Sequence, residues 1–566
     1  MACSDARLNR LNSTAPIRSR APEEGSFQIP LWGVPLILVL LYVCLFGGLG
    51  ALGLVGPDEP RYAAIARAMA ETHDWITPRL WGTPWFEKPV LYYWTAGIAM
   101  RIFGVSEFAA RLPSALAALL AVIAVAWTAL RSYGVVAAWY SLLMLPTSVA
   151  MIGFSRAASP DMLFAGLLTA AMAVASEMLQ KLRPDPVWRV AFGFFLGAAV
   201  LAKGPAAVIL AGGATLLWAA LSRQWRAPFR FLHPLIIVVF CATALPWYIL
   251  CALRNPDFLR VFIWQHNFER YLTPVFEHRQ PFWFFGPIFL LGILPWLPLF
   301  VSGLYDAFRN LRIEAVKNSP ALFLSCWALF PVLFFSLSQS KLPGYILPAI
   351  PPAILLLAGS TVRQTERTAK GVRLALLCTG LLFPLLAGIA VAKLPVILGL
   401  TFSPDQNPVP GLRVGLAVAL AGGALGVGLA IYRKWNGAVC MLAGTTVILL
   451  LIATYVVLPN LDEFVSVRPV ALGIIGSYSP KLDKIAVLHL PRDFEYGLDY
   501  YFQTALSEWT PEKKEVRLIF SGKQGLEQLA LLPQFEYTAR NKMFMPLDPG
   551  GRVFLVDLAL EKSPGN

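Results

Sequence analysis

Uninterrupted apolar runs of about 20 residues, the length that crosses a bilayer as an α-helix, recur along this chain from Ile29 to about Pro459. Outer-membrane barrels give short alternating segments instead. A cytosolic enzyme of this size would carry about 25% charged residues, whereas this chain of 566 residues carries 14%. The pattern therefore predicts a polytopic α-helical membrane protein.

Cysteine usage and the N-terminus agree with a membrane protein. Cys3 precedes the first apolar run, and the other six cysteines lie inside apolar runs, so no disulfide framework is expected in the polar C-terminal region. The first run follows a mostly polar leader, residues 1–28, and continues to Val55 without a small-residue cleavage pattern. It is therefore predicted to be a retained helix rather than a cleaved signal.

Positive charge is concentrated in short loops between the apolar runs. Six such loops hold sixteen Lys and Arg residues against three acids, and the positive-inside rule makes all six cytoplasmic. This assignment works only if one of fourteen apolar blocks, residues 89–105 with Arg101, does not span. We therefore expect about thirteen transmembrane helices, and the net charge of +14 reflects topology rather than nucleic-acid binding. The six loops are residues 131–134, 180–189, 222–230, 307–317, 363–373 and 432–437.

The predicted topology divides the chain into three parts: a cytoplasmic leader (1–28), a transmembrane domain (29–458) and a tail (459–566) outside the cytoplasm. Two long polar loops of the transmembrane domain, residues 56–111 and 253–282, share that outer side. In the tail, β-rich apolar runs alternate with helix-like stretches. The tail is therefore predicted to form a small α/β domain.

The first outer loop contains two polar segments, GPDEPRY at residues 56–62 and WFEKPVLYYW at residues 85–94. Asp58 could cap a helix with Pro60 in its first turn, or it could belong to a site with its charged neighbours. Lys88 could be part of an aromatic interfacial belt, or it could bind a lipid phosphate as a compact positive charge.

Four later parts of the chain bring further ionisable residues to the same membrane surface. RAASPD ends in Asp161 at the start of a span, and Lys203 ends another span. QHNFERY (265–271) lies in the fourth outer loop, and SKLPGYILP (340–348) follows a later span. Carboxylates and cations that converge on one surface suit a phosphorylated, lipid-linked substrate.

Two other patterns give weaker signals. Glu87 and His266 could hold a divalent cation, but two ligands without recognisable spacing are a weak metal motif. The stretch Gly48-Leu-Gly-Ala-Leu-Gly53 matches the dinucleotide fingerprint, yet no strand precedes it, so helix packing is the better interpretation.

The segments GPDEPRYA, FEKPVLYYW, SRAASPD and SKLPGYILPAIPP resemble, in this order and over essentially the whole chain, the lipid-dependent and metal-independent branch of GT-C glycosyltransferases. That branch contains the protein O-mannosyltransferases and the bacterial aminoarabinose transferases, and the layout is most similar to the latter. The resemblance implies a GT-C fold with juxtamembrane helices in the first outer loop and a periplasmic C-terminal domain. It also implies a location in the bacterial inner membrane with a periplasmic active site.

The resemblance also implies roles for individual residues. Asp58 and Asp161 take the positions of the family's two acids and are the expected catalytic residues. In this chain Gly344 precedes the late tyrosine, where relatives often carry a larger residue. The residues expected to bind substrate or phosphate are Arg61, Glu87, Lys88, Lys203, Arg270, Lys341 and Tyr345.

The implied activity is that of an inverting pentosyltransferase, which moves 4-amino-4-deoxy-L-arabinose from undecaprenyl phosphate to lipid A phosphates and so confers polymyxin resistance. The expected partners are that donor, lipid A and membrane lipids, and no cofactor is required. One alternative is a related polyprenyl-phosphate-sugar transferase with a protein or another glycan as acceptor. A lipid or solute transporter is disfavoured, because ionisable residues are nearly absent from the predicted span centres.

Overall fold

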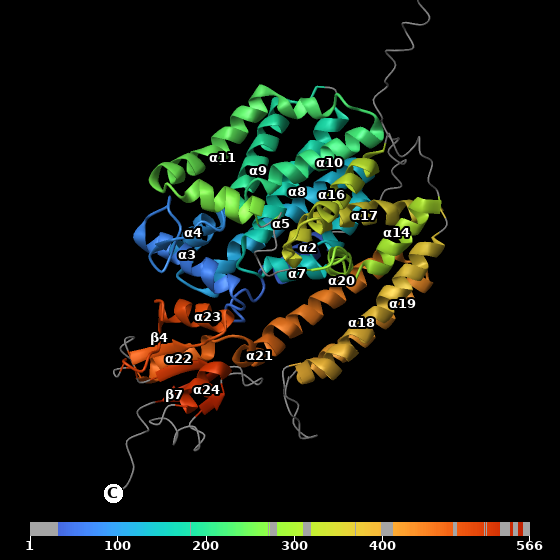
Figure 1. The fold of residues 1–566 in the computed structure, drawn as a ribbon. Coiled ribbons are helices and arrows are strands. Elements are labelled where there is room, and N and C mark those ends of the chain that lie inside the picture. The colour runs from blue at the N-terminus through green and yellow to red at the C-terminus, as the bar shows by residue number, and fades with distance from the viewer. Residues whose placement is uncertain are drawn as a thin grey trace, which may run out of the picture.

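Helices make up most of the fold in the computed structural model (Figure 1), which contains one small mixed sheet and one short hairpin among the residues it describes. The described residues are 32–181, 183–269, 271, 280–309, 319–367, 369–397, 411–478, 484–513, 516, 518–531, 544–546 and 553–557.

Within this described part, eight helical spans are long and apolar enough to cross a membrane, and two bent helix pairs also qualify if each pair counts as one span. Three shorter apolar helices accompany them: α2 with η1 (Gly33–Phe46), α10 (Ala206–Ser222) and α16 (Pro320–Ser336). Each predicted block except 89–105 corresponds to one of these elements, while the number that crosses a membrane stays a prediction. The eight spans are α5 (Glu107–Tyr133), α8 (Pro160–Gln180), α9 (Pro186–Lys203), α11 (Pro234–Arg254), η4 with α17 (Pro343–Ala349, Ile350–Arg367), α18 (Lys370–Ile397), α19 (Leu412–Ile431) and α20 with η5 and α21 (Trp435–Ile452, Ala453–Val457, Leu458–Val465).

The two bent pairs contain breaks in the apolar blocks that begin near residues 134 and 283. Helices α6 (Val135–Met144) and α7 (Val149–Ser155) meet at 58°, and α13 (Phe285–Gly292) and α14 (Leu297–Arg309) meet at 112°. Two short helices complete this part of the chain, η2 (Pro228–Leu232) and η3 (Arg260–Glu269).

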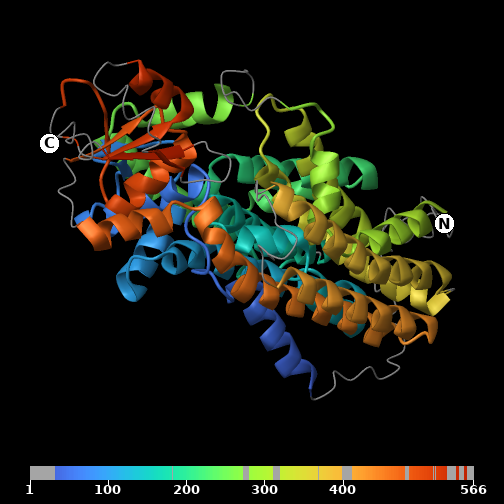
Figure 2. The same cartoon turned by 90° about the horizontal axis from the view of Figure 1, so that it is seen from below.

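Helix α8 lies at the centre of the bundle. In its most apolar stretch 94% of the residues are buried, against 28% in α18, α19 and the span of α20. Figure 2, the same ribbon seen from below, shows the gold and orange helices α18–α20 along the outside of the bundle. Small residues recur on α8, and the Gly166 Cα lies so close to the Ala117 carbonyl of α5 that an added Cβ would be 2.3 Å from that oxygen.

The first outer loop forms helices that are too short to span. Helix α3 (Asp58–Thr72) leads through the hairpin β1 (Arg79–Leu80) and β2 (Thr83–Pro84) to α4 (Leu91–Phe103). Helix α4 occupies the block that the loop charges exclude as a span, and it is 13 residues long. The capping interpretation of Asp58 is wrong, because Pro57 is the N-cap residue and Asp58 is the first residue of α3.

The first apolar run is helical over a shorter length than its composition predicts. The α-helix α2 (Gly33–Leu41) continues as the π-helix η1 (Tyr42–Phe46), which ends before the glycine-rich stretch. Three arginines donate to carbonyl groups of η1 and of the segment after it: Arg156 to Val43, Cys44 and Gly47, Arg111 to Leu49, Leu52 and Gly53, and Arg468 to Gly50 and Ala51. These bonds replace the helical hydrogen bonds that the unwound segment lacks.

After α21, the tail contains α22 (Arg468–Tyr478) and a five-stranded sheet of order β4-β3-β5-β7-β6. Strands β3 and β5 pair in parallel, and β7 runs antiparallel to β5. The sequence prediction of an α/β architecture is confirmed for the described tail, and the domain limits stay predictions. Its elements are β3 (Ile485–Leu488), α23 (Arg492–Phe502), β4 (Ser507–Glu508), β5 (Leu518–Gly522), α24 (Lys523–Ala530), β6 (Phe544–Pro546) and β7 (Val553–Asp557).

Candidate active site

The ends of α8 and α9 bring a carboxylate and an ammonium group together. Helix α8 begins with Pro160 in its first turn, and the Ser159 hydroxyl accepts a hydrogen bond from the Asp161 backbone N–H at 3.1 Å. Helix α9 ends at Lys203 because Gly204, at φ +88°, leaves the helical conformation. Since α8 and α9 pack against each other, these ends meet, and the Lys203 ammonium donates to the Asp161 carboxylate.

Aromatic rings surround the Lys203 ammonium. Its Nζ lies 4.5 Å from the centroid of the Tyr345 ring and 5.6 Å from that of Phe164. At Gly344, a Cβ would be 2.3 Å from one carboxylate oxygen of Asp161. The glycine therefore allows the η4 backbone to approach the Asp161 carboxylate. With a larger residue at position 344, Asp161 could not keep this conformation.

A second group of charges alternates in sign between α3 and the segment before α4. The Arg61 guanidinium contacts the Asp58 carboxylate at 2.5 Å and the Glu87 carboxylate at 3.1 Å. Glu87 in turn contacts the Lys88 ammonium at 3.2 Å. Arg61 and Lys88 thus both contact the largely buried Glu87 carboxylate, while the Asp58 carboxylate stays partly exposed.

Exposure distinguishes the members of this second group. The Asp58 side chain is 50% exposed, whereas those of Arg61, Glu87 and Lys88 are 14% or less exposed. Burial disfavours the charge on Arg61, but Glu87 and Asp58 outweigh burial and raise the pKa of Arg61 above its ordinary value. Arg61 thus stays cationic. Burial, reinforced by Glu87, raises the pKa of Tyr62 well above its ordinary value, so this phenol stays protonated.

The two charge groups lie at the same end of the bundle because Glu59 connects their elements. Glu59 forms a buried bidentate ion pair with Arg111 of α5, with distances of 3.1 and 2.7 Å. Its carboxylate also accepts the Ala158 backbone N–H at 2.7 Å, three residues before Asp161. The acid next to Asp58 therefore fixes α3 against the start of α8.

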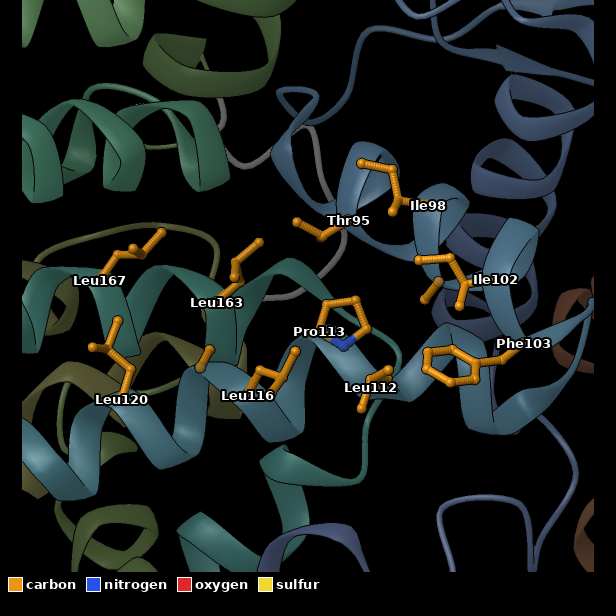
Figure 3. Close-up of a pocket in the computed structure, with 12 residues that line it drawn as sticks. Thr95, Ile98, Ile102, Phe103, Leu112, Pro113, Leu116, Leu120, Leu163 and Leu167 are labelled. Atoms are coloured by element: carbon orange, nitrogen blue, oxygen red, sulfur yellow. The ribbon is translucent and has the colours of Figure 1, made fainter.

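An apolar groove of about 420 Å³ runs between α4, α5 and α8, close to this end of the bundle (Figure 3). Leu163, two residues after Asp161, lines it from α8. Thr95 and Ile98 line it from α4, and Leu116 lines it from α5. The groove thus lies near the start of α8 and continues along α5 and α8.

Comparison with known proteins places this geometry in a family. The sequence model of the dolichyl-phosphate-mannose-protein mannosyltransferases matches residues 31–262. The undecaprenyl phosphate-α-4-amino-4-deoxy-L-arabinose arabinosyl transferase 2 of Sodalis glossinidius is 32% identical over 551 residues, which cover 90% of this chain and 96% of that protein. This chain belongs to the family of undecaprenyl phosphate-α-4-amino-4-deoxy-L-arabinose arabinosyl transferases.

Two further relatives support the family assignment. The transferase of Edwardsiella ictaluri is 34% identical over 352 residues, a match that spans 61% of this chain and 62% of that relative's length. The crystal structure of ArnT from Cupriavidus metallidurans bound to undecaprenyl phosphate is 25% identical, with a TM-score of 0.74 over 94% of this chain and 99% of that one. The predicted GT-C fold, the membrane class and the expectation of a glycosyltransferase are thereby confirmed.

Of the predicted site residues, the structure brings most into two groups. One contains Asp58, Arg61, Glu87 and Lys88, and the other contains Asp161, Lys203 and Tyr345. Lys341 belongs to neither set of ion pairs found among the described residues; its buried Nζ donates to the Ser338 carbonyl at 2.5 Å, and burial lowers the pKa of Lys341. Arg270 lies outside the described residues.

The Glu87–His266 metal hypothesis fits this arrangement poorly. The Glu87 carboxylate is already in contact with the cations Arg61 and Lys88. In the part of the chain that the structure describes, no cluster of three or more His, Cys, Asp or Glu side chains could hold a metal ion. The metal site therefore stays a prediction.

The rings around Arg61 and the Phe164 ring beside Lys203 were not predicted, whereas Tyr345 was. The Arg61 guanidinium lies 5.3 Å from the centroid of the Tyr62 ring and 5.4 Å from that of Trp85. The centroid of the Tyr496 ring, from α23 of the tail, lies 5.9 Å from the same guanidinium. Tyr62 and Trp85 stand in the quoted motifs and could have been found there. Nothing in the sequence near Tyr496 points to the site, because 435 positions separate it from Arg61.

Proposed function

We propose that this protein is an inverting glycosyltransferase that moves 4-amino-4-deoxy-L-arabinose from undecaprenyl phosphate to a lipid A phosphate at the periplasmic face of the bacterial inner membrane. The observation that supports it most is the run of alternating charges Asp58–Arg61–Glu87–Lys88, which is placed beside the start of α8 by Glu59. The activity is the one for which the relatives are named.

The cations provide for the leaving group. As the bond between the sugar C1 and the donor phosphate oxygen breaks, the bonding electron pair stays on undecaprenyl phosphate, which leaves as a dianion. Two described cations can stabilise this charge: the Lys88 ammonium and the Arg61 guanidinium. Both contact the Glu87 carboxylate. Arg270 remains a further predicted phosphate ligand.

The carboxylates serve the sugar rather than the acceptor. A lipid A phosphate oxygen is already anionic, so it can attack C1 from the opposite face without a strong general base. Asp58 is half exposed and can pair with the 4-ammonium group or with the positive charge that develops on the ring. Asp161 is held by Lys203, which fixes the orientation of its carboxylate.

The apolar groove beside α8 supports a lipid-linked donor. Its lining is formed by aliphatic side chains and one phenylalanine with a single threonine. An isoprenoid chain needs an apolar path within the membrane, and the groove offers an apolar surface between α4, α5 and α8 (Figure 3).

The test is the mass of lipid A from cells that express the full chain. We expect the wild type to add a phosphate-linked pentosamine, Lys88→Ala to abolish the addition, and the matched variant Lys434→Ala, an exposed lysine in a predicted cytoplasmic loop, to leave it intact. Absence of the pentosamine with the wild-type protein would overturn the proposal. Transfer of a different sugar, or transfer to a protein or glycan, would favour the related transferase instead.

A further inference from the structure

Helix α23 of the tail lies against α3, the helix that carries Asp58 and Arg61 (Figure 1). Arg67 of α3 donates to the Tyr500 carbonyl of α23 at 2.9 Å, and its guanidinium lies 5.0 Å from the centroid of the Tyr500 ring. The Tyr501 hydroxyl donates to the Glu107 carboxylate at 2.8 Å and accepts the Leu54 backbone N–H at 3.0 Å. The C-terminal end of α23 is therefore fixed to the transmembrane domain at several points.

A second set of contacts fixes the chain that leads to α23. Arg468, at the start of α22, contacts Asp462 and the carbonyls of Gly50 and Ala51. The Asp462 carboxylate also accepts the Gly53 backbone N–H at 2.8 Å. Because these partners belong to the unwound segment just before α3, the position of α23 relative to α3 is determined on two sides.

Tyr496 stands one helical turn before Tyr500, so both side chains lie on the same face of α23, toward α3. The Tyr496 ring lies 5.9 Å from the Arg61 guanidinium and is half-buried. Together with the rings of Tyr62 and Trp85 and the carboxylates of Asp58 and Glu87, it encloses Arg61. Of the three rings, only that of Tyr496 comes from the tail.

We propose that Tyr496 is a positioning residue through which the tail completes the active site: its ring holds the Arg61 guanidinium in the orientation that meets the donor phosphate. This inference rests on the proposed function. The arginine side chain has several rotatable bonds, so fixing its guanidinium costs conformational entropy. A ring face that attracts the cation holds the guanidinium in place before the donor binds, so donor binding no longer has to supply that entropy. The effect should therefore appear in the KM for the donor more than in kcat.

The experiment uses the purified full chain with undecaprenyl phosphate-linked aminoarabinose and lipid A. Tyr496→Leu removes the ring face and should raise the donor KM by about threefold to tenfold, the size expected for one cation–π contact, with a smaller change in kcat. Tyr496→Phe keeps the ring and should retain the wild-type KM. Tyr432→Leu is the matched control, because Tyr432 is exposed and lies in a predicted cytoplasmic loop.

A second measurement separates positioning from a general loss of structure. Binding of undecaprenyl phosphate alone is measured for Tyr496→Leu in the wild-type and Arg61→Gln backgrounds. We expect weakening by the leucine only where Arg61 is present. Equal weakening in both backgrounds, or a wild-type KM for Tyr496→Leu in an active enzyme, would overturn the inference. An inactive wild-type protein would contradict the proposed function instead.

Discussion

At the scale of single residues, two adjacent acids in the first outer loop have opposite roles. Asp58 is half exposed beside Arg61, whereas Glu59 is buried in a bidentate pair with Arg111 and also accepts the Ala158 backbone N–H. Their type and position in the sequence do not distinguish them. Burial does, since a buried carboxylate with three polar partners is fixed in place, while a half-exposed one can meet a substrate.

This difference predicts separate effects of two matched amide substitutions. Glu59→Gln leaves the Arg111 charge without its partner and should lower the free energy of unfolding by about 3–5 kcal/mol. Asp58→Asn should leave the melting temperature in detergent close to that of the wild type and abolish sugar transfer. A stable and active Glu59→Gln protein would show that the pair does not hold α3 in place.

Gly344 gives a second prediction at this scale. Gly344→Ala places a methyl group against the Asp161 carboxylate, so this carboxylate must move away from Lys203. We expect kcat to fall at least tenfold with an unchanged melting temperature. Gly286→Ala is the control, because nothing lies within 4 Å of a Cβ at that position. Equal activity of the two variants would contradict the proposed role of the Asp161 orientation.

At the scale of elements, the end of η1 and the unwound segment after it depend on arginine donors from three other parts of the chain. Arg156 alone donates to Val43, Cys44 and Gly47. A guanidinium carries five N–H donors in a wide planar fork, so it can reach several carbonyls at once. An ammonium group carries three donors on one nitrogen and reaches carbonyls over a smaller area.

Arg156→Lys should therefore destabilise the protein although it conserves charge. Each buried carbonyl left without a donor costs about 1–3 kcal/mol, so the melting temperature in detergent should fall clearly. The same exchange at Arg226, which is exposed, should leave it unchanged. Similar melting temperatures for both variants would show that water replaces the lost donors.

At the scale of the whole molecule, the tail carries a buried titratable group in the helix that reaches the active site. Burial raises the pKa of Asp499 to about 7, while the hydrogen bond from the Leu506 backbone N–H lowers it in part. The folded tail therefore binds a proton that the unfolded chain releases near its ordinary pKa of about 3.9. Folded stability should decrease as pH rises from about 4 to 7 and level off above 7.

The decrease should reach at most about 1.4 kcal/mol per pH unit. Hydrogen exchange of the α23 amides at pH 5 and pH 8 measures it, with stronger protection expected at pH 5. Asp499→Asn keeps an acceptor for Leu506 and should remove the difference. Asp493→Asn, on the same helix and less buried, should retain it. A pH dependence that survives Asp499→Asn would assign the titration to another group.

The membrane class and the α/β tail could be predicted from the sequence, because hydropathy and the alternation of apolar runs are properties of consecutive residues. The residues of the first group were also predictable in part, since Asp58, Arg61, Glu87 and Lys88 stand in two short motifs of one loop. The end of the first helix at Phe46 was not, because the carbonyl donors that permit unwinding are Arg111, Arg156 and Arg468, far along the chain.

The sequence by itself thus determined what kind of protein this is and which outer segments carry the charges. Only the tertiary structure decided how those charges pair: Lys203 with Asp161, Glu59 with Arg111, and Arg61 between two carboxylates. It also decided that Tyr496 of the tail completes the wall around Arg61. The physical reason is that a charge pair or a ring contact depends on distances of a few ångströms between elements, which no local pattern of residues records.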